Sequence, residues 1–198
     1  MVGREDDQKE ILKPLLDTNI VENVSIIPII GVGGLGKTTL AQFVYNNEKI
    51  KTYFELKLWI CVSDNVDVKQ IVKQILESLK VERHEENLEN LQNHLRKKLN
   101  GKIYLLVLEN VWNENKEKWL LLKNLQMGDV WGARIIITTR FVKAAYITGT
   151  TSPHALKGLA PEKPWSLFVK MAFKEGKKPE NQALVALGKQ NFRFSNGW

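Results

Sequence analysis

The sequence predicts an α/β protein in three layers, with a mostly parallel β-sheet between two layers of helices. Apolar runs of strand length, at 24–30, 102–108 and 132–140, alternate with stretches that have the spacing of amphipathic helices. Such alternation favours a doubly wound sheet with right-handed crossovers. A glycine-rich loop after the first apolar run supports the same architecture, because ligands of such sheets bind beyond the carboxyl ends of the strands.

The glycine-rich loop, Gly31-Val-Gly-Gly-Leu-Gly-Lys-Thr-Thr39, fits the phosphate-loop spacing Gly-x4-Gly-Lys-[Ser/Thr]. Glycines leave backbone N–H groups open to phosphate oxygens, and a following helix directs its positive dipole end at the same anion. Lys37 can reach the β- and γ-phosphates, and the Thr38 hydroxyl can bind Mg²⁺. An ordinary glycine-rich turn would leave the Lys-Thr-Thr unexplained. The predicted nucleotide-binding residues of the loop are Gly31, Gly33, Gly34, Leu35, Gly36, Lys37, Thr38 and Thr39.

The stretches around the loop predict a helix, a strand and a second helix. Residues 6–16 carry one apolar helical stripe, although Pro14 predicts an early bend or a later start. The run 24–30 is the expected first strand. Pro28 conflicts with this, because proline cannot donate a hydrogen bond to a neighbouring strand. The second helix is expected over 38–47.

The middle of the chain predicts a strand and two helices. Residues 56–62 form a β-rich run in which Cys61 is interpreted as a buried strand residue; a reactive thiol is the alternative, and no histidine is near it in sequence. Asp67 is a plausible N-cap for a helix over 68–79, where apolar residues recur at helical spacing. A further helix is expected over 88–99.

Polar residues follow the two later apolar strands. The run 102–108 leads into Glu109-Asn110, and the run from 132 ends in Thr138-Thr139-Arg140, with a helix expected near 116–125 between them. Because the carboxyl ends of parallel strands share one edge of a sheet, we expect both segments to meet the phosphate loop there. From 156 the pattern changes to that of helices, over about 161–173 and 181–190.

Composition excludes several other classes of protein. The 198 residues are 43% hydrophobic and 26% charged, which is typical of a globular domain, and no apolar run approaches the length of a membrane span. The net charge of +7 is spread along the chain without interleaved aromatics, so solvated helix ends explain it better than nucleic-acid binding. The three histidines have no metal-ligand spacing, and a single cysteine indicates a reducing compartment.

Several motifs besides the loop carry a likeness to a known family: Val2-Gly3-Arg4-Glu5, Phe54–Asp64, Gly132–Arg140, Leu156–Leu159 and Trp165–Phe168. With them the chain resembles the NB-ARC nucleotide-binding domain of plant disease-resistance proteins over residues 2–190. Trp112 and the 59–64 pattern indicate the coiled-coil, non-Toll type. The resemblance implies a P-loop NTPase domain over 1–155 and the start of a small helical lid subdomain over 156–198. The lid is expected to be truncated, because the family's Gly-Leu-Pro-Leu and Met-His-Asp segments are missing.

The resemblance also implies a function. It indicates a STAND-type switch in a cytoplasmic plant immune receptor, ADP-bound at rest and ATP-bound when signalling. Partners would be other domains of a resistance protein or a partner immune receptor. Gly3 and Arg4, with Val2 beside them, would lie near the adenine and ribose. Arg140 would sense the γ-phosphate, although it could instead be only a surface ion-pair partner.

The acidic motif departs from the family, which usually has two aspartates where this chain has Glu109 and Asn110. Glu109, with Thr38, could still hold Mg²⁺. Asn110 cannot accept a proton as a carboxylate does, and losing a general base costs about 10²–10⁴ in rate. We therefore predict nucleotide binding with little or no hydrolysis and assign no catalytic residue. Two alternatives stay open: an active P-loop ATPase, and a non-catalytic adaptor or decoy that pairs with full-length resistance proteins.

Overall fold

The computed structural model describes residues 3–19, 24–62, 67–81, 87–112, 117, 119 and 132–159. In this part of the chain five strands form one sheet in the order β2-β3-β4-β1-β5, and all neighbouring strands are parallel. The strands are β1 (Val24–Ile30), β2 (Leu56–Cys61), β3 (Tyr104–Glu109), β4 (Ala133–Thr139) and β5 (His154–Ala155). The predicted parallel α/β architecture is confirmed.

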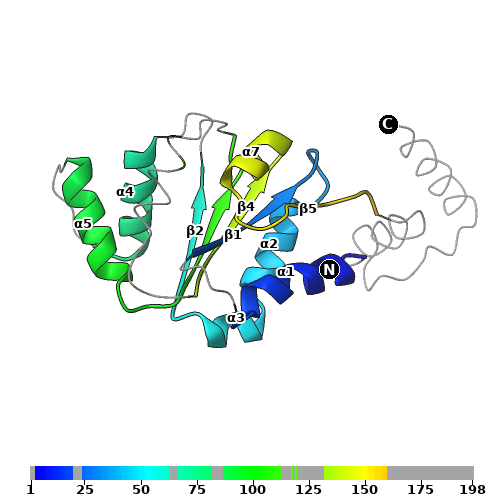
Figure 1. Ribbon diagram of the computed structural model, residues 1–198, viewed down its shortest axis with the longest axis horizontal. Coiled ribbons are helices and arrows are strands. Elements are labelled where there is room, and N and C mark those ends of the chain that lie inside the picture. Colours follow the sequence, from blue (N-terminus) through cyan, green and yellow to red (C-terminus); the bar gives the residue numbers. More distant parts are fainter. Residues whose placement is uncertain are drawn as a thin grey trace, which may run out of the picture. The chain divides into compact units, whose positions relative to one another are not determined.

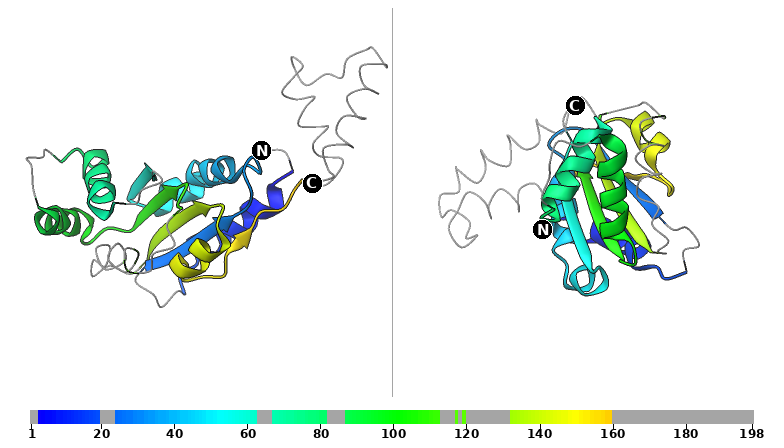
Figure 2. Two further views of the ribbon diagram at one scale, coloured as in Figure 1. Left: turned by 90° about the horizontal axis from the view of Figure 1, so that it is seen from above. Right: turned by 90° about the vertical axis from the view of Figure 1, so that its left-hand side faces the viewer.

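Helices cover both faces of the sheet. They are α1 (Glu5–Leu16), α2 (Lys37–Tyr45), α3 (Glu48–Tyr53), α4 (Val68–Ser78), α5 (Leu88–Leu99) and α7 (Val142–Thr148). Figure 1 shows α4 and α5 on one side of the sheet and α1, α2 and α3 on the other. Figure 2 shows α4 and α5 side by side on one face of the sheet, in agreement with their packing against each other. The predicted three layers are therefore present.

The core beneath α4 is formed by apolar residues that alternate along the strands and recur at helical spacing along α4. Leu58 and Ile60 of β2 point into this core, whereas the alternate residues Lys57 and Trp59 are half-buried and Cys61 is exposed. The α4 side chains in the core are Val68, Ile71, Val72, Ile75 and Leu76. The Asp67 side chain accepts a hydrogen bond from the Lys69 N–H, which confirms the predicted N-cap.

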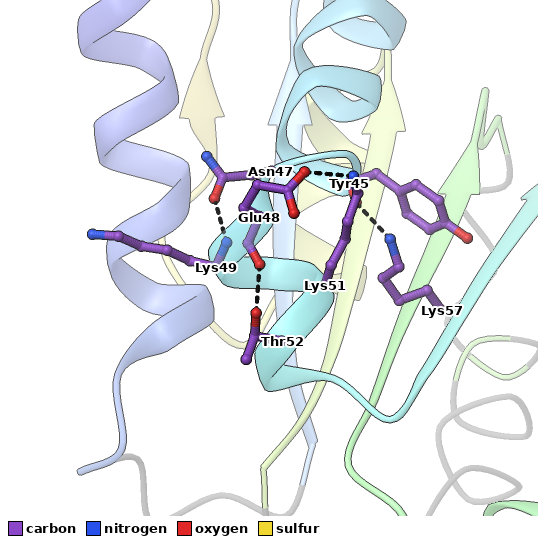
Figure 3. Close-up of polar contacts among 7 residues, drawn as sticks. All are labelled: Tyr45, Asn47, Glu48, Lys49, Lys51, Thr52 and Lys57. Atoms are coloured by element: carbon purple, nitrogen blue, oxygen red, sulfur yellow. Dashed lines mark hydrogen bonds and ion pairs between the residues drawn. The ribbon is translucent and has the colours of Figure 1, made fainter.

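Some expectations about individual elements were wrong or incomplete. Helix α1 begins at Glu5, so the later start is wrong; Pro14 lies in its last turn, where it removes only one intrahelical hydrogen bond. Helix α3 was not expected, and it begins where the Asn47 side chain accepts a hydrogen bond from the Lys49 N–H (Figure 3). Helix α7 and strand β5 were not expected either.

The conflict at Pro28 is resolved by the neighbours of β1. Successive residues of a strand direct their hydrogen-bonding groups to opposite sides. The Ile30 carbonyl accepts from the Leu156 N–H (2.8 Å), whereas the Gly31 N–H points the other way, to the Thr139 carbonyl (3.3 Å). Pro28 has the parity of Ile30, so its nitrogen faces the β5 side, where pairing begins only one residue later. The hydrogen bonds between β1 and β4 therefore do not need an N–H from residue 28.

Part of the prediction lies outside the described residues. This holds for the helices expected near 161–173 and 181–190, and for most of 116–125, where Glu117 and Trp119 alone are described and are helical. The described residues fall into two compact units, 7–156 and a second that contains 3–6 and 157–159. In the second unit, Arg4 Nη1 donates to the Lys157 carbonyl (2.6 Å). The division into 1–155 and 156–198 stays a prediction.

Arg134 fastens the end of α1 to the sheet. It lies in β4 and is only 1% exposed. Its Nε donates to the Pro14 carbonyl (3.2 Å), and its Nη2 donates to the Asp17 carbonyl (2.9 Å). The last carbonyls of a helix have no partner within the helix, so this guanidinium supplies donors that would otherwise be missing.

Replacing Arg134 with methionine is expected to lower the free energy of unfolding by about 3 kcal/mol, because the part-buried carbonyls of Pro14 and Asp17 lose a charged donor. Urea denaturation of the whole chain measures the change. Arg96→Met is the control: Arg96 is exposed on α5, and its replacement should cost no more than about 0.5 kcal/mol. Equal losses in the two variants would contradict this role of Arg134.

Candidate functional site

A cavity of about 470 Å³ lies beyond the carboxyl ends of the central strands. The phosphate loop leads from the end of β1 into α2 along its wall, and the ends of β2, β3 and β4 supply the remainder. Its lining residues are Gly33, Gly34, Gly36, Lys37, Thr38, Thr39, Cys61, Glu109, Asn110, Thr138 and Arg140. The polar residues at the ends of β3 and β4 therefore meet the phosphate loop, as the sequence predicts.

The loop has a backbone that favours glycine. Gly34 and Gly36 have φ angles of 80° and 88°, in the left-handed region that side chains strain. Gly36 is also the N-cap residue of α2, so the first N–H groups of that helix begin at the loop. At Gly33 a Cβ atom would lie 3.5 Å from the Arg140 guanidinium carbon. The loop thus presents bare backbone to the cavity, as anion binding requires.

Lys37 folds back over this loop. Its Nζ donates to the carbonyls of Gly31 (2.6 Å) and Val32 (3.0 Å). Burial lowers the pKa of Lys37, and the positive charge of Arg140 lowers it further. An anion placed between these two cations would relieve their repulsion, which is the electrostatic character of a phosphate site.

Glu109 lies at the end of β3, and each of its carboxylate oxygens has a donor. The Thr38 hydroxyl donates to Oε1, and the Trp59 indole N–H donates to Oε2 at 3.1 Å. A hydroxyl and a carboxylate side by side are oxygen ligands of the kind that Mg²⁺ prefers. Within the described ranges no group of three histidine, cysteine, aspartate or glutamate residues could hold a metal.

Asn110 follows Glu109 with a φ angle of 60°, in the left-handed region. Asparagine tolerates this region better than most residues. The Asn110 N–H donates to the Thr138 hydroxyl of β4 (2.9 Å), and the next N–H, of Val111, donates to the Thr138 carbonyl (2.8 Å). Thr138 thus holds the turn after β3 against β4 and places Asn110 on the cavity wall.

Arg140 extends from the end of β4. Its guanidinium carbon lies 5.4 Å from the centre of the Trp112 ring, a cation–π contact. Trp112 also lies against Phe141, with ring centres 5.4 Å apart. Trp112, packed against Phe141, thus supports the guanidinium, which lines the cavity beside Gly33.

Comparison with known proteins identifies the family. The NB-ARC domain family matches residues 4–178. The chain belongs to the NB-ARC family. Disease resistance protein RGA2 of Solanum bulbocastanum is 42% identical over 199 residues, which cover 98% of this chain and 20% of RGA2. Disease resistance protein RPP13 of Arabidopsis thaliana is 36% identical over 205 residues, which cover 100% of this chain and 24% of RPP13. The chain thus spans a fifth to a quarter of these relatives' length.

Solved structures share the fold at lower identity. A STAND (Signal Transduction ATPase with Numerous Domains) protein with a tetratricopeptide repeat sensor from Pyrococcus horikoshii has a TM-score of 0.55 at 22% identity, covering 100% of this chain and 28% of that one. Cdc6p from Pyrobaculum aerophilum has a TM-score of 0.65 at 17% identity, covering 84% and 48%. These likenesses show the P-loop ATPase fold.

Not every predicted residue of the NB-ARC site lines the cavity. Gly31 and Leu35 do not; a Cβ at Gly31 would lie 3.1 Å from the Leu156 carbonyl and 3.2 Å from the Leu35 side chain, so this glycine serves close packing. Val2 lies outside the described residues. Gly3 and Arg4 belong to the second compact unit, and their contact with adenine and ribose stays a prediction.

Cys61 corrects the sequence interpretation, because it is exposed and lines the cavity instead of being buried. Strand β2 is at the edge of the sheet, and Cys61 is its last residue, on the face opposite Leu58 and Ile60. Partial burial raises the pKa of the thiol, and the Glu109 charge raises it further. The alternation of Lys57, Trp59 and Cys61 with apolar residues was the signal that could have placed Cys61 on that face.

Alkylation of Cys61 is expected to report on the cavity. Cys61 is the single cysteine of the chain, so intact mass follows its modification by iodoacetamide without ambiguity. Its raised pKa leaves little thiolate at neutral pH, so reaction should be slow and should accelerate as the pH rises. ADP or ATP with Mg²⁺ should slow it about tenfold, whereas unfolded protein should react at the same rate with or without nucleotide. Equal rates for the folded protein would contradict a nucleotide in this cavity.

Proposed function

We propose that this NB-ARC chain is the nucleotide-binding switch module of a plant immune receptor, holding ADP at rest and ATP when signalling. The supporting observation is that Lys37, Glu109 and Arg140, from three separate segments, line one cavity with the phosphate loop. A cytoplasmic location belongs to the proposal. No helix in the described part of the chain is long and apolar enough to cross a membrane.

In this proposal some residues of the site bind the nucleotide, and Arg140 senses its γ-phosphate. The loop N–H groups and the start of α2 would bind the phosphates, and Lys37 would exchange the two loop carbonyls for phosphate oxygens. Arg140 presents a fixed fork of donors beside Gly33, which suits it to report a γ-phosphate. Gly3 and Arg4 would bind the base and ribose.

Magnesium fits the same proposal. Thr38 and Glu109 would hold Mg²⁺, with the nucleotide and water as the other ligands. When bound, the ion would neutralise phosphate charge. Asn110, which follows Glu109 and also lines the cavity, has no carboxylate to accept a proton. Little or no hydrolysis is therefore part of the proposal.

Two other functions make different demands on the site. An active ATPase needs a base near the γ-phosphate, and Asn110 does not provide one. An adaptor or decoy would act only by pairing with full-length resistance proteins and would not need Lys37. In the switch proposal the partners are other domains of a resistance protein or a partner immune receptor, and nucleic acid is no partner.

Identifying a bound nucleotide tests the proposal directly. The chain is purified by gel filtration and denatured, and the released small molecules are separated by anion-exchange chromatography. About one ADP or ATP per chain is expected. Protein that carries no nucleotide is then titrated with a fluorescent ADP analogue in Mg²⁺. A chain that releases no nucleotide and binds none would overturn the proposal.

A further inference from the structure

The indole of Trp59 lies beside the candidate metal site. Strand β2 pairs with β3 so that Cys61 is opposite Glu109, which places Trp59 two residues earlier on the same face of the sheet. From there its Nε1–H donates to Glu109 Oε2 at 3.1 Å. The contact joins neighbouring strands at the point where the sheet ends and the cavity begins.

This hydrogen bond fixes the orientation of a flexible carboxylate. A glutamate has one more rotatable bond than an aspartate, so more rotamer freedom must be lost to hold its carboxylate in one place. With Oε2 bonded to the indole, Oε1 is directed at the Thr38 hydroxyl. Hydrogen bonds to an ionised acceptor are about twice as strong as neutral ones, so the indole is an effective anchor.

Trp59 is itself held in place from the other end of β2. The Tyr45 ring, at the end of α2, meets it edge-on, with ring centres 5.5 Å apart and planes at 88°. Lys57 holds Tyr45: its Nζ donates to the Tyr45 carbonyl (3.0 Å) and lies 4.3 Å from the centre of the Tyr45 ring (Figure 3). Lys57 thus holds Tyr45, Tyr45 packs against Trp59, and Trp59 donates to Glu109.

We infer that Trp59 is a positioning residue for Glu109, through which a glutamate at this strand end presents one oxygen to Thr38 and to a Mg²⁺–nucleotide complex. The inference rests on the proposed function for its ligand and on the Trp59–Glu109 contact for its mechanism. An aspartate carries the same carboxylate one methylene nearer the backbone, so from this position it would reach less far toward the indole and the hydroxyl, and the indole and the glutamate act as a pair.

The contact can be measured without any nucleotide. The chain has six tryptophans, and Trp59→Phe assigns the Trp59 indole N–H by removing one signal from a ¹H–¹⁵N spectrum. In the nucleotide-free protein Glu109→Gln is expected to move this signal upfield in ¹H, because the acceptor loses its charge. An unmoved signal would overturn the inference even if the protein binds nucleotide normally.

The role is measured by the Mg²⁺ dependence of ADP affinity, taken as the ratio of Kd in EDTA to Kd in Mg²⁺. Trp59→Phe keeps an aromatic ring but removes the N–H, and it should reduce the ratio about tenfold, as loss of partners behind metal ligands does. It should leave the Kd in EDTA unchanged. Trp119→Phe, at a buried tryptophan on the core side of the sheet, should leave both values unchanged.

A double-mutant cycle separates positioning from general packing. In the Glu109→Asp background, Trp59→Phe should have no further effect, because the shorter carboxylate has already left the indole. An equal loss in both backgrounds, or a wild-type ratio in Trp59→Phe, would overturn the inference. If the wild-type chain binds no nucleotide at all, the proposed function fails, and the metal role of Trp59 fails with it, whatever the indole signal shows.

Discussion

Replacing Lys37 with alanine is expected to weaken the binding of ADP and ATP about a hundredfold. The Lys37 ammonium lies over the phosphate loop, in the cavity that Arg140 also lines, and its pKa is already lowered by burial and by that second cation. A phosphate group would restore a favourable partner to it. Hydrogen bonds to charged groups contribute about 1.5–3 kcal/mol, and about 2.7 kcal/mol corresponds to a hundredfold change in Kd. Calorimetric or fluorescence titration measures the loss.

A matched lysine shows whether this loss is local. Lys49 is exposed on α3 and does not line the cavity, so Lys49→Ala should leave the Kd of both nucleotides unchanged. Unfolding curves of both variants establish that they are folded. Lys37→Ala with wild-type affinity would refute the phosphate role of the loop. An adaptor that merely pairs with full-length receptors would keep pairing in the Lys37→Ala variant, which separates that alternative from the switch.

The phosphate-binding loop could be predicted from the sequence because its residues are close together in the chain. The spacing from Gly31 to Thr38 determines a loop, a helix start, an amine and a hydroxyl, and all are within eight residues. The strand ends at Glu109 and Arg140 could be added because apolar runs reveal buried parallel strands, and such strands share an edge.

What the sequence missed depends on the order of the strands. Cys61 was interpreted as buried because its run is apolar, but β2 is an edge strand and its last residue faces the cavity. Trp59 was seen only as part of a motif, and its hydrogen bond to Glu109 follows from the register between β2 and β3. Pro28 presented a conflict for the same reason: its nitrogen faces a neighbour that pairs for only two residues. No local pattern specifies which strands become neighbours.

Replacing Asn110 with aspartate is expected to raise the rate of ATP hydrolysis about a hundredfold, the low end of what a general base contributes. The substitution changes an amide to a carboxylate of nearly the same shape. The φ angle of 60° at this position suits either residue, and the N–H bond to Thr138 belongs to the backbone and persists. The new carboxylate would therefore lie on the cavity wall where Asn110 lies now. Phosphate release under single-turnover conditions measures the rate.

Asn100→Asp provides the matched control for Asn110→Asp. Asn100 is the exposed C-cap residue of α5 and does not line the cavity, so the same change of charge there should leave hydrolysis as slow as in the wild type. Comparable ADP affinity in all three proteins would show that the rate change is not a binding effect. Fast hydrolysis by both the wild type and Asn110→Asp would mean that another group activates the water, and the switch proposal would then yield to an active ATPase. Slow hydrolysis in Asn110→Asp, with ATP bound, would instead contradict the prediction that the missing carboxylate at this position is what limits hydrolysis.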